Sequence, residues 1–325
     1  MNYKLFGTQT GLPASEIILG AANFGQHGNH GADAKEIQKI LTTYTDAGGN
    51  FIDISDQYQF GEAEKTVGLF IEHQRHNFII CTKYTRSSEQ SPQPANFGNH
   101  RKAMRQSVDS SLKRLKTDYI DIYMPHYDDG ITPLDEVVRG LEDLVNAGKI
   151  LYTGLANFPA WKASIIASAI PLTAMQIEYN LVQRTAEREL FAMAEHFGLG
   201  TMLYSPLAGG LLSGKYRKGI AGRLTKATHN GVTENEAVKA VLDQLEEIAV
   251  EVDASSGQVA LAWTLTKNAF PLVGARTAEQ LTDSIGALSI RLNEEQITRL
   301  DRASKVSLGY PHDLLKTVQK HYRSR

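Results

Sequence analysis

The stretch Ala47-Gly48-Gly49-Asn50-Phe51-Ile52-Asp53-Ile54 joins the end of an amphipathic helical segment to a short apolar run. Glycine often ends a helix because it accepts the left-handed backbone conformation that follows the last turn. The same return recurs at Asn146-Ala147-Gly148-Lys149, directly before another apolar run. Tight helix-to-strand returns of this kind are typical of repeated strand–helix units around a parallel sheet.

The number of apolar runs indicates the architecture. Short runs rich in Ile, Leu, Val and Tyr alternate with longer segments whose apolar residues recur at helical spacing, such as Met104, Val108 and Leu112. Eight runs are expected as strands: Ile17–Gly20, Phe51–Ile54, Phe78–Thr82, Tyr119–Met124, Leu151–Leu155, Ala174–Ile177, Thr201–Tyr204 and Pro271–Val273. Eight strands, each followed by a helix, predict an α/β protein with a closed (β/α)8 barrel, the TIM barrel.

An open, doubly wound sheet is the alternative architecture for alternating strands and helices. Its phosphate-binding turn carries the pattern Gly-x-Gly-x-x-Gly after an early strand. The first expected strand is followed by Gly20-Ala-Ala-Asn-Phe-Gly25, which does not match that pattern. The barrel is therefore the favoured fold.

The chain length of 325 residues fits one barrel, although about 150 residues per domain would give two domains. We expect a single domain over residues 1–325, with residues 306–325 as a C-terminal extension. Two long connections, residues 86–99 and 207–232, both follow strand ends. In a barrel, those ends form the face on which active sites are built.

Composition narrows the classes of function. Hydrophobic residues make up 42% of the chain and charged residues 22%, which suits a folded protein with a sizeable core. Lys and Arg number 34 against 36 Asp and Glu, so nucleic acid is not an expected partner. The lone Cys81 allows no intramolecular disulfide, and the sequence shows neither a signal-peptide pattern nor a membrane-spanning run. We expect a cytoplasmic protein without membrane contact.

Four chemically versatile side chains lie at or just after the ends of expected strands: Asp53, Tyr58, Lys83 and His126. A closed barrel would bring them together over its mouth. An ammonium group beside a tyrosine stabilises the phenolate, so the pKa of Tyr58 is expected to fall below its usual value of about 10. With His126 holding a substrate oxygen, this set suits protonation of a carbonyl oxygen while a hydride reaches the carbon.

The residues around these four side chains form longer motifs: Phe51-Ile-Asp-Ile-Ser-Asp-Gln-Tyr58, Cys81-Thr-Lys83 and Asp121-Ile-Tyr-Met-Pro-His126. Others follow them or stand between them: Arg114-Leu-Lys-Thr-Asp-Tyr-Ile-Asp121, Gly154-Leu-Ala-Asn157, Gln176-Ile-Glu-Tyr-Asn180, Tyr204-Ser-Pro-Leu-Ala-Gly-Gly-Leu-Leu-Ser-Gly-Lys-Tyr216 and Gly274-Ala-Arg276. Together they resemble the aldo-keto reductase superfamily, in the branch with aryl-alcohol-dehydrogenase-like and potassium-channel-β-subunit-like members. The resemblance implies that residues 1–16 form a β-hairpin at the bottom of the barrel.

The resemblance also implies an NADP(H) cofactor, favoured over NAD(H). It places Tyr204 against the nicotinamide and uses residues 205–216 to cradle the pyrophosphate, with residues 207–232 as a cofactor-clamping loop. It assigns the 2′-phosphate to Arg276, at the start of a helix. Ser284 stands where an asparagine is usual in the family. The implied cofactor contacts are Ala21, Ala22, Asp53, Asn157, Gln176, Tyr204, Ser205, Pro206, Leu207, Gly209, Lys215, Arg223, Gly274, Arg276, Gln280 and Ser284.

The function implied by the resemblance is reversible reduction of aldehydes or ketones to alcohols, with Tyr58 as the general acid. A nicotinamide-binding, redox-sensing partner protein with weak catalysis is the alternative within the same branch. An unrelated barrel, such as a carboxylate-based hydrolase or isomerase, is a third interpretation. His27 and His30 lack a third ligand, so no metal is expected. The sequence leaves open which small-molecule carbonyl is the substrate and whether the chain forms a homo-oligomer.

Overall fold

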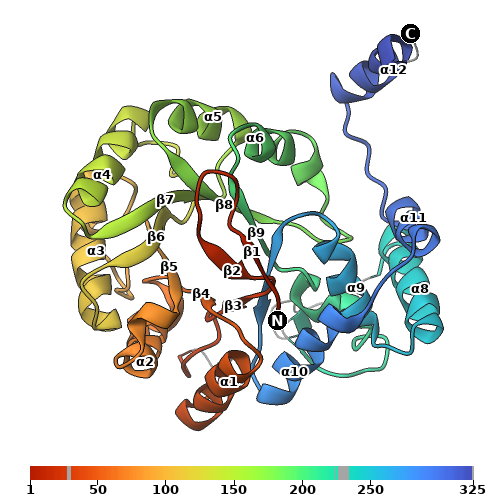
Figure 1. Cartoon of the computed structure of the whole chain (residues 1–325), viewed down its shortest axis with the longest axis horizontal. Helices are drawn as coiled ribbons and strands as arrows, with labels where there is room; N and C mark the ends of the chain where they lie inside the picture. Colours follow the sequence, from red (N-terminus) through yellow and green to blue (C-terminus); the bar gives the residue numbers. More distant parts are fainter. Residues whose placement is uncertain (28–30, 223, 226–233, 324–325) are drawn as a thin grey trace.

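The computed structural model describes residues 1–27, 31–222, 224–225 and 234–323. Its centre is a closed barrel of eight parallel strands in the order β10-β3-β4-β5-β6-β7-β8-β9, with the helices outside (Figure 1). The barrel strands are β3 (Ile18–Gly20), β4 (Phe51–Asp53), β5 (Ile79–Tyr84), β6 (Ile120–Pro125), β7 (Ile150–Ala156), β8 (Leu172–Glu178), β9 (Gly200–Tyr204) and β10 (Phe270–Gly274). The predicted (β/α)8 barrel is confirmed.

The helices follow the strands along the chain, as a barrel of this kind requires. They are α1 (Ala34–Asp46), α2 (Glu62–Ile71), α3 (Arg101–Leu115), α4 (Leu134–Asn146), α5 (Ala160–Ala169), α6 (Leu190–His196), α8 (Glu236–Glu251), α9 (Ser256–Leu265), α10 (Ala278–Gly286), α11 (Glu294–Ala303) and α12 (His312–Arg323). The two quoted glycine returns connect α1 to β4 and α4 to β7, with Gly48 and Gly148 at positive φ.

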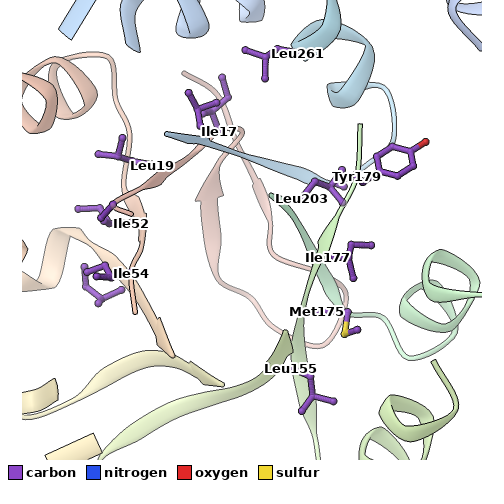
Figure 2. Packing of buried hydrophobic residues seen from close by; sticks show 14 of the residues in the cluster. Ile17, Leu19, Ile52, Ile54, Leu155, Met175, Ile177, Tyr179, Leu203 and Leu261 are labelled. Atoms are coloured by element: carbon purple, nitrogen blue, oxygen red, sulfur yellow. The ribbon is translucent and has the colours of Figure 1, made fainter. Parts of the chain in front are cut away.

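Side chains alternate across each strand, and this alternation separates two apolar clusters. One cluster fills the space between the strands and the helices, and Figure 2 shows members such as Leu19, Ile54 and Ile177. The other cluster joins side chains from successive strands, among them Phe51 and Cys81. Asp53 and Lys83 lie two residues after Phe51 and Cys81. Period two therefore puts the polar pair on the same face as this second cluster, one step nearer the strand ends.

The N-terminal hairpin covers the other end of the barrel. Strands β1 (Tyr3–Leu5) and β2 (Pro13–Ser15) pair antiparallel, as the resemblance implied. The fully buried Phe6, directly after β1, places its ring 5.3 Å from that of Phe51 and 5.0 Å from that of Phe270. The hairpin thus closes the hydrophobic interior at the amino ends of the strands, opposite the predicted site.

The C-terminal segment leaves the barrel. Helix α12 lies away from the other helices in Figure 1, at the end of an extended connection that follows α11. The assignment of residues 1–325 to a single domain stays a prediction. Among the described residues, no helix is both long and apolar enough to cross a membrane.

Candidate active site

A buried ion pair lies at the carboxyl ends of the first barrel strands. The Lys83 Nζ donates to Asp53 Oδ1 at 2.7 Å and to the Ile54 carbonyl at 2.6 Å. The Gln176 amide, from the opposite part of the barrel, donates to the same Asp53 oxygen at 2.8 Å. Burial alone would lower the pKa of Lys83, but Asp53 opposes it and the net shift is upward. Lys83 is therefore a buried cation at neutral pH.

Tyr58 lies beside this cation, in a 3₁₀ turn (Tyr58–Gly61) between β4 and α2. The turn ends at Gly61, whose φ of +85° suits glycine; a Cβ there would lie 2.9 Å from the Arg114 side chain. The Lys83 Nζ is 5.3 Å from the centre of the Tyr58 ring. The structure thus brings the acid candidate and the ammonium together, as predicted.

The predicted fall in the pKa of Tyr58 is wrong. Burial raises this pKa, and the opposing effect of the Lys83 charge is smaller, since Asp53 offsets part of it. The Lys83 ammonium favours the phenolate, but the loss of water around the phenol disfavours it more. Tyr58 consequently holds its proton firmly, which suits an acid rather than a base.

His126 completes the group of four. It follows β6, and its backbone N–H donates to the Tyr84 carbonyl at 3.0 Å and lies 3.0 Å from the Thr85 hydroxyl oxygen. Its ring is edge-on to that of Tyr58, with the centroids 5.7 Å apart. Burial lowers the pKa of His126 to about 3, and the charges of Lys83 and Arg86 add to this effect. The imidazole is therefore neutral and can donate only one N–H.

The side chains of Asn157 and Tyr204 extend the site. The Tyr204 hydroxyl donates to Asn157 Oδ1 at 2.9 Å, and the Asn157 amide donates to the His126 carbonyl at 2.9 Å. Burial, with smaller contributions from Glu178 and Tyr58, raises the pKa of Tyr204 to about 12. The expected nicotinamide contacts Asn157, Gln176 and Tyr204 are thus neutral groups held by hydrogen bonds to the four central residues or to each other.

The connection after β9 contains a turn with several residues at positive φ, a backbone conformation that favours glycine. Ser205 has a positive φ of 54°, and Pro206 and Leu207 lead into a 3₁₀ segment (Ala208–Ser213) with Gly209 and Gly210 at positive φ. A Cβ on Gly210 would come within 2.6 Å of the Lys215 Nζ. The glycine therefore leaves room for the Lys215 side chain to fold back over this segment.

A second cation lies near Lys215. Burial lowers the pKa of Lys215, and the charge of Arg276 adds to this effect. In the described part of the chain, neither side chain has a carboxylate within ion-pair distance. Two neighbouring cations without a carboxylate partner are what a phosphate site requires.

Arg276 lies two residues before the first residue of α10, and not at the start of that helix as expected. The N-cap of α10 is Thr277, so Arg276 precedes the helix rather than opening it. Its backbone N–H donates to Gln280 Oε1 at 3.0 Å, and the Ala278 N–H donates to Glu36 Oε1 at 2.8 Å. These two amides are already paired, whereas no carboxylate lies within ion-pair distance of the Arg276 guanidinium in the described part of the chain.

The remaining predicted cofactor contacts lie near β3, at the end of β10, within α10, or outside the described residues. Ala21 donates its N–H to the Asp53 carbonyl, and the exposed Ala22 accepts from the Gln59 amide. Gly274 ends β10, and Ser284 donates its hydroxyl to the Gln280 carbonyl within α10. Arg223 and His30 lie outside the described residues. Among the residues that are described, no group of three His, Cys, Asp or Glu side chains could hold a metal ion.

The residues present fit a nicotinamide dinucleotide. The neutral groups of Asn157, Gln176 and Tyr204 lie around the central four residues, and the cations Lys215 and Arg276 lie beside the glycine turn. Positive charge and close backbone approach suit phosphates, whereas neutral amides and an aromatic face suit the nicotinamide end.

A sequence profile of the Aldo/keto reductase family matches residues 16–305, which include every barrel strand. The chain belongs to this family. This aldo/keto reductase is 33% identical to the aryl-alcohol dehydrogenase [NADP(+)] of Phanerodontia chrysosporium, over 93% of this chain and 86% of that protein. It is 32% identical to norsolorinic acid reductase A of Aspergillus parasiticus, over 99% and 86%. It is 34% identical to the uncharacterized oxidoreductase YrpG of Bacillus subtilis, over 93% and 95%.

Three residues of this aldo/keto reductase site were missed from the sequence. The Ser55 Oγ lies 3.1 Å from His126 Nδ1, the buried Asp56 follows it, and Glu36 reaches the start of α10. Ser55 and Asp56 lie within the quoted motif, but spacing along the chain does not tell which way loop side chains point. Glu36 gave no signal, because its contact joins residues 242 positions apart.

Proposed function

We propose that this oxidoreductase reduces an aldehyde or ketone to an alcohol with NADPH, and that Tyr58 gives the proton to the carbonyl oxygen. The observation that carries the proposal is the convergence of Tyr58, the buried Lys83–Asp53 ion pair and neutral His126 at the carboxyl ends of the strands. Family membership supports the reaction class. Two relatives, named as an aryl-alcohol dehydrogenase and a norsolorinic acid reductase, also support it.

The groups that would hold the cofactor are those described above. Asn157, Gln176 and Tyr204 would hold the nicotinamide, and the glycine turn with Lys215 would hold the pyrophosphate. When bound, the reduced nicotinamide supplies the hydride that the carbonyl carbon accepts. Arg276 would contact the 2′-phosphate, which supports NADPH as the preferred form.

The proton step follows from the charges of the chain. Tyr58 keeps its proton until negative charge develops on the substrate oxygen, and then donates it. The phenolate left behind faces the Lys83 ammonium, which Asp53 keeps in place. This arrangement stabilises the charge where it develops, in surroundings with little water. In the reverse direction, the same phenolate would accept the alcohol proton.

His126 would hold the substrate oxygen from the other side. A neutral imidazole donates one hydrogen bond without competing as an acid, since the pKa of His126 lies at about 3. Tyr58 and His126 together would therefore give the carbonyl oxygen two donors, only one of which releases its proton.

The test is the oxidation of NADPH and, in parallel, of NADH, over a panel of aromatic, aliphatic and sugar aldehydes and ketones. Turnover that prefers NADPH and is lost in Tyr58→Phe is the expected result. Turnover that survives in Tyr58→Phe would refute Tyr58 as the acid. Tight NADPH binding without turnover of any carbonyl would favour a redox-sensing partner protein, and failure to bind either nucleotide would refute the cofactor assignment.

A further inference from the structure

Ser55 is the partner of the His126 ring. Its Oγ lies 3.1 Å from Nδ1, and the hydroxyl is fully buried. Because the imidazole is neutral, only one of its nitrogens carries a hydrogen. If Ser55 donates to Nδ1, the ring hydrogen is on Nε2. If Nδ1 donates to Ser55, Nε2 is bare and can only accept.

The direction of this hydrogen bond matters for the reaction proposed above. A carbonyl oxygen that gains negative charge needs donors. Only the tautomer with its hydrogen on Nε2 leaves a donor on the nitrogen that is not engaged by Ser55. The Ser55 hydroxyl therefore has to donate to Nδ1 for His126 to assist reduction.

The same hydroxyl has two competing acceptors, Asp56 Oδ1 at 3.3 Å and the Lys83 backbone carbonyl at 3.4 Å. Only the Asp56 acceptor changes its charge with pH. The Gln57 backbone N–H donates to the Ser55 Oγ at 3.4 Å. A hydroxyl has one hydrogen to donate and two lone pairs. An ionised Asp56 would attract that hydrogen, whereas a protonated Asp56 can donate to Ser55 and leave the hydroxyl hydrogen for His126.

Asp56 is in surroundings that disfavour its charge. The side chain is almost fully buried, and within the described residues its Oδ2 has no hydrogen-bond partner. Burial and the nearby carboxylate of Glu64 raise the pKa of Asp56 to about 7, although Arg114 opposes them. Arg114 is engaged by Glu64 itself, with 2.6 Å between its Nε and the Glu64 Oε2.

We propose that Ser55 and Asp56 are positioning residues that place the hydrogen of the His126 imidazole on Nε2, and that this placement holds only while the Asp56 carboxyl is protonated. The inference rests on the proposed function. In the protonated state, Asp56 Oδ1–H donates to Ser55, Ser55 donates to Nδ1, and Nε2 carries the ring hydrogen. Loss of one proton to water reverses the chain: Nδ1–H donates to Ser55, Ser55 donates to the Asp56 carboxylate, and Nε2 is bare.

Other charged and titratable groups surround this chain of hydrogen bonds. They are Glu64 on α2, Arg114 on α3, Lys83 and Tyr84 on β5, Arg86 after β5, Tyr123 on β6, Tyr127 after His126, and Tyr58. The pKa values of the four tyrosines and of Lys83 are raised, so these groups keep their protons through neutral pH. Asp56 is then the group whose ionisation reverses the chain near pH 7.

The first test is the pH profile of kcat/KM for a carbonyl, at saturating NADPH, between pH 6 and 8.5. For the unaltered protein, we expect kcat/KM to fall roughly tenfold or more as pH rises through about 7, because one hydrogen bond to a charged oxygen is lost. Asp56→Asn keeps a neutral donor beside Ser55, so its profile should be flat in this range. Ser55→Ala should be flat as well, at a level roughly two- to tenfold below the acidic limit of the unaltered protein.

The second test reads the tautomer without cofactor or turnover. In the 15N-histidine-labelled protein, His126 is identified as the signal lost in His126→Gln. We expect its hydrogen on Nε2 at pH 6 and on Nδ1 at pH 8.5, and on Nε2 at both pH values in Asp56→Asn. A tautomer that does not change between pH 6 and 8.5 would overturn the inference, as would the same change in Asp56→Asn. If the tautomer changes as expected but the protein shows no Tyr58-dependent turnover of a carbonyl, only the proposed function is overturned.

Discussion

Replacement of Lys83 by methionine should destabilise the protein strongly, because it leaves the Asp53 carboxylate buried without its cation. Asp53 and Lys83 are both buried and are joined at 2.7 Å. In Lys83→Met, the carboxyl retains the Gln176 amide as a donor but loses the ammonium. Removal of one partner from a buried pair typically costs about 3–5 kcal/mol.

The upper limit of this cost can be derived from proton uptake. A stranded carboxylate can take up a proton on folding, and for an ordinary aspartate at pH 7 this costs about 4 kcal/mol. Because the cost of proton uptake falls by about 1.4 kcal/mol per pH unit, the destabilisation at pH 5 should shrink to about 1.5 kcal/mol. The destabilisation of Lys83→Met should therefore grow with rising pH between 5 and 7.

Equilibrium urea unfolding, followed by tryptophan fluorescence, measures these differences. Lys116→Met is the matched control, because Lys116 pairs with Glu72 at 2.9 Å on the surface, and loss of an exposed pair should change the stability far less. The double variant Asp53→Asn/Lys83→Met should recover about 2 kcal/mol or more, since no charge is then stranded. A cost for Lys83→Met below about 1 kcal/mol at pH 7, or one independent of pH, would refute the reasoning.

Three further outcomes follow from the structure. Arg276→Ala should raise the Kd of NADPH roughly 10- to 100-fold, because a charge-assisted contact is lost, and the Kd of NADH less than about threefold. Fluorescence titration measures both Kd values. Equal increases for the two nucleotides would show that Arg276 does not bind the 2′-phosphate. Glu36→Gln keeps an acceptor for the Ala278 N–H but removes a negative charge at the start of α10, two residues along the chain from Arg276. NADPH should therefore bind roughly threefold more tightly, with NADH binding unchanged; weaker NADPH binding in the same titration would contradict this. Phe6→Ala should lower the free energy of unfolding by about 3–5 kcal/mol, because it leaves a cavity beside the rings of Phe51 and Phe270. The kcat of the folded protein should not change. A large loss of kcat would contradict the placement of Phe6 at the end of the barrel opposite the site.

Most of the fold could be predicted from the sequence, because its signals are local. Apolar runs that alternate with helical patterns predicted all eight barrel strands, and the structure changes only their limits. Strand β5, for example, continues to Tyr84, beyond the predicted end at Thr82, because Lys83 and Tyr84 pair with Met124 and Pro125 of β6. Strand ends depend on the neighbouring strand, and that information is not local.

The candidate site was predictable where it depends on strand register and not where it depends on loops. Asp53 and Lys83 lie at strand ends, so closure of the barrel brings them together. The orientation of Ser55 toward His126 depends on loop dihedral angles that spacing does not encode. Glu36 reaches Ala278 because β3 and β10 are neighbours in the closed barrel, which makes α1 and α10 neighbours too. The predicted direction of the pKa shift of Tyr58 was wrong, because the burial that raises this pKa exists only in the folded chain.

Tyr58 is proposed to donate the proton at a nicotinamide-dependent carbonyl site. The most direct measurement compares kcat of the unaltered protein and Tyr58→Phe with one aldehyde, at saturating NADPH, together with the Kd of NADPH for both proteins. We expect kcat to fall by roughly 10²- to 10⁴-fold, the usual contribution of a positioned acid, with the Kd changed by less than about twofold. A kcat within about threefold of that of the unaltered protein would contradict the claim, as would a loss of turnover fully explained by weaker NADPH binding.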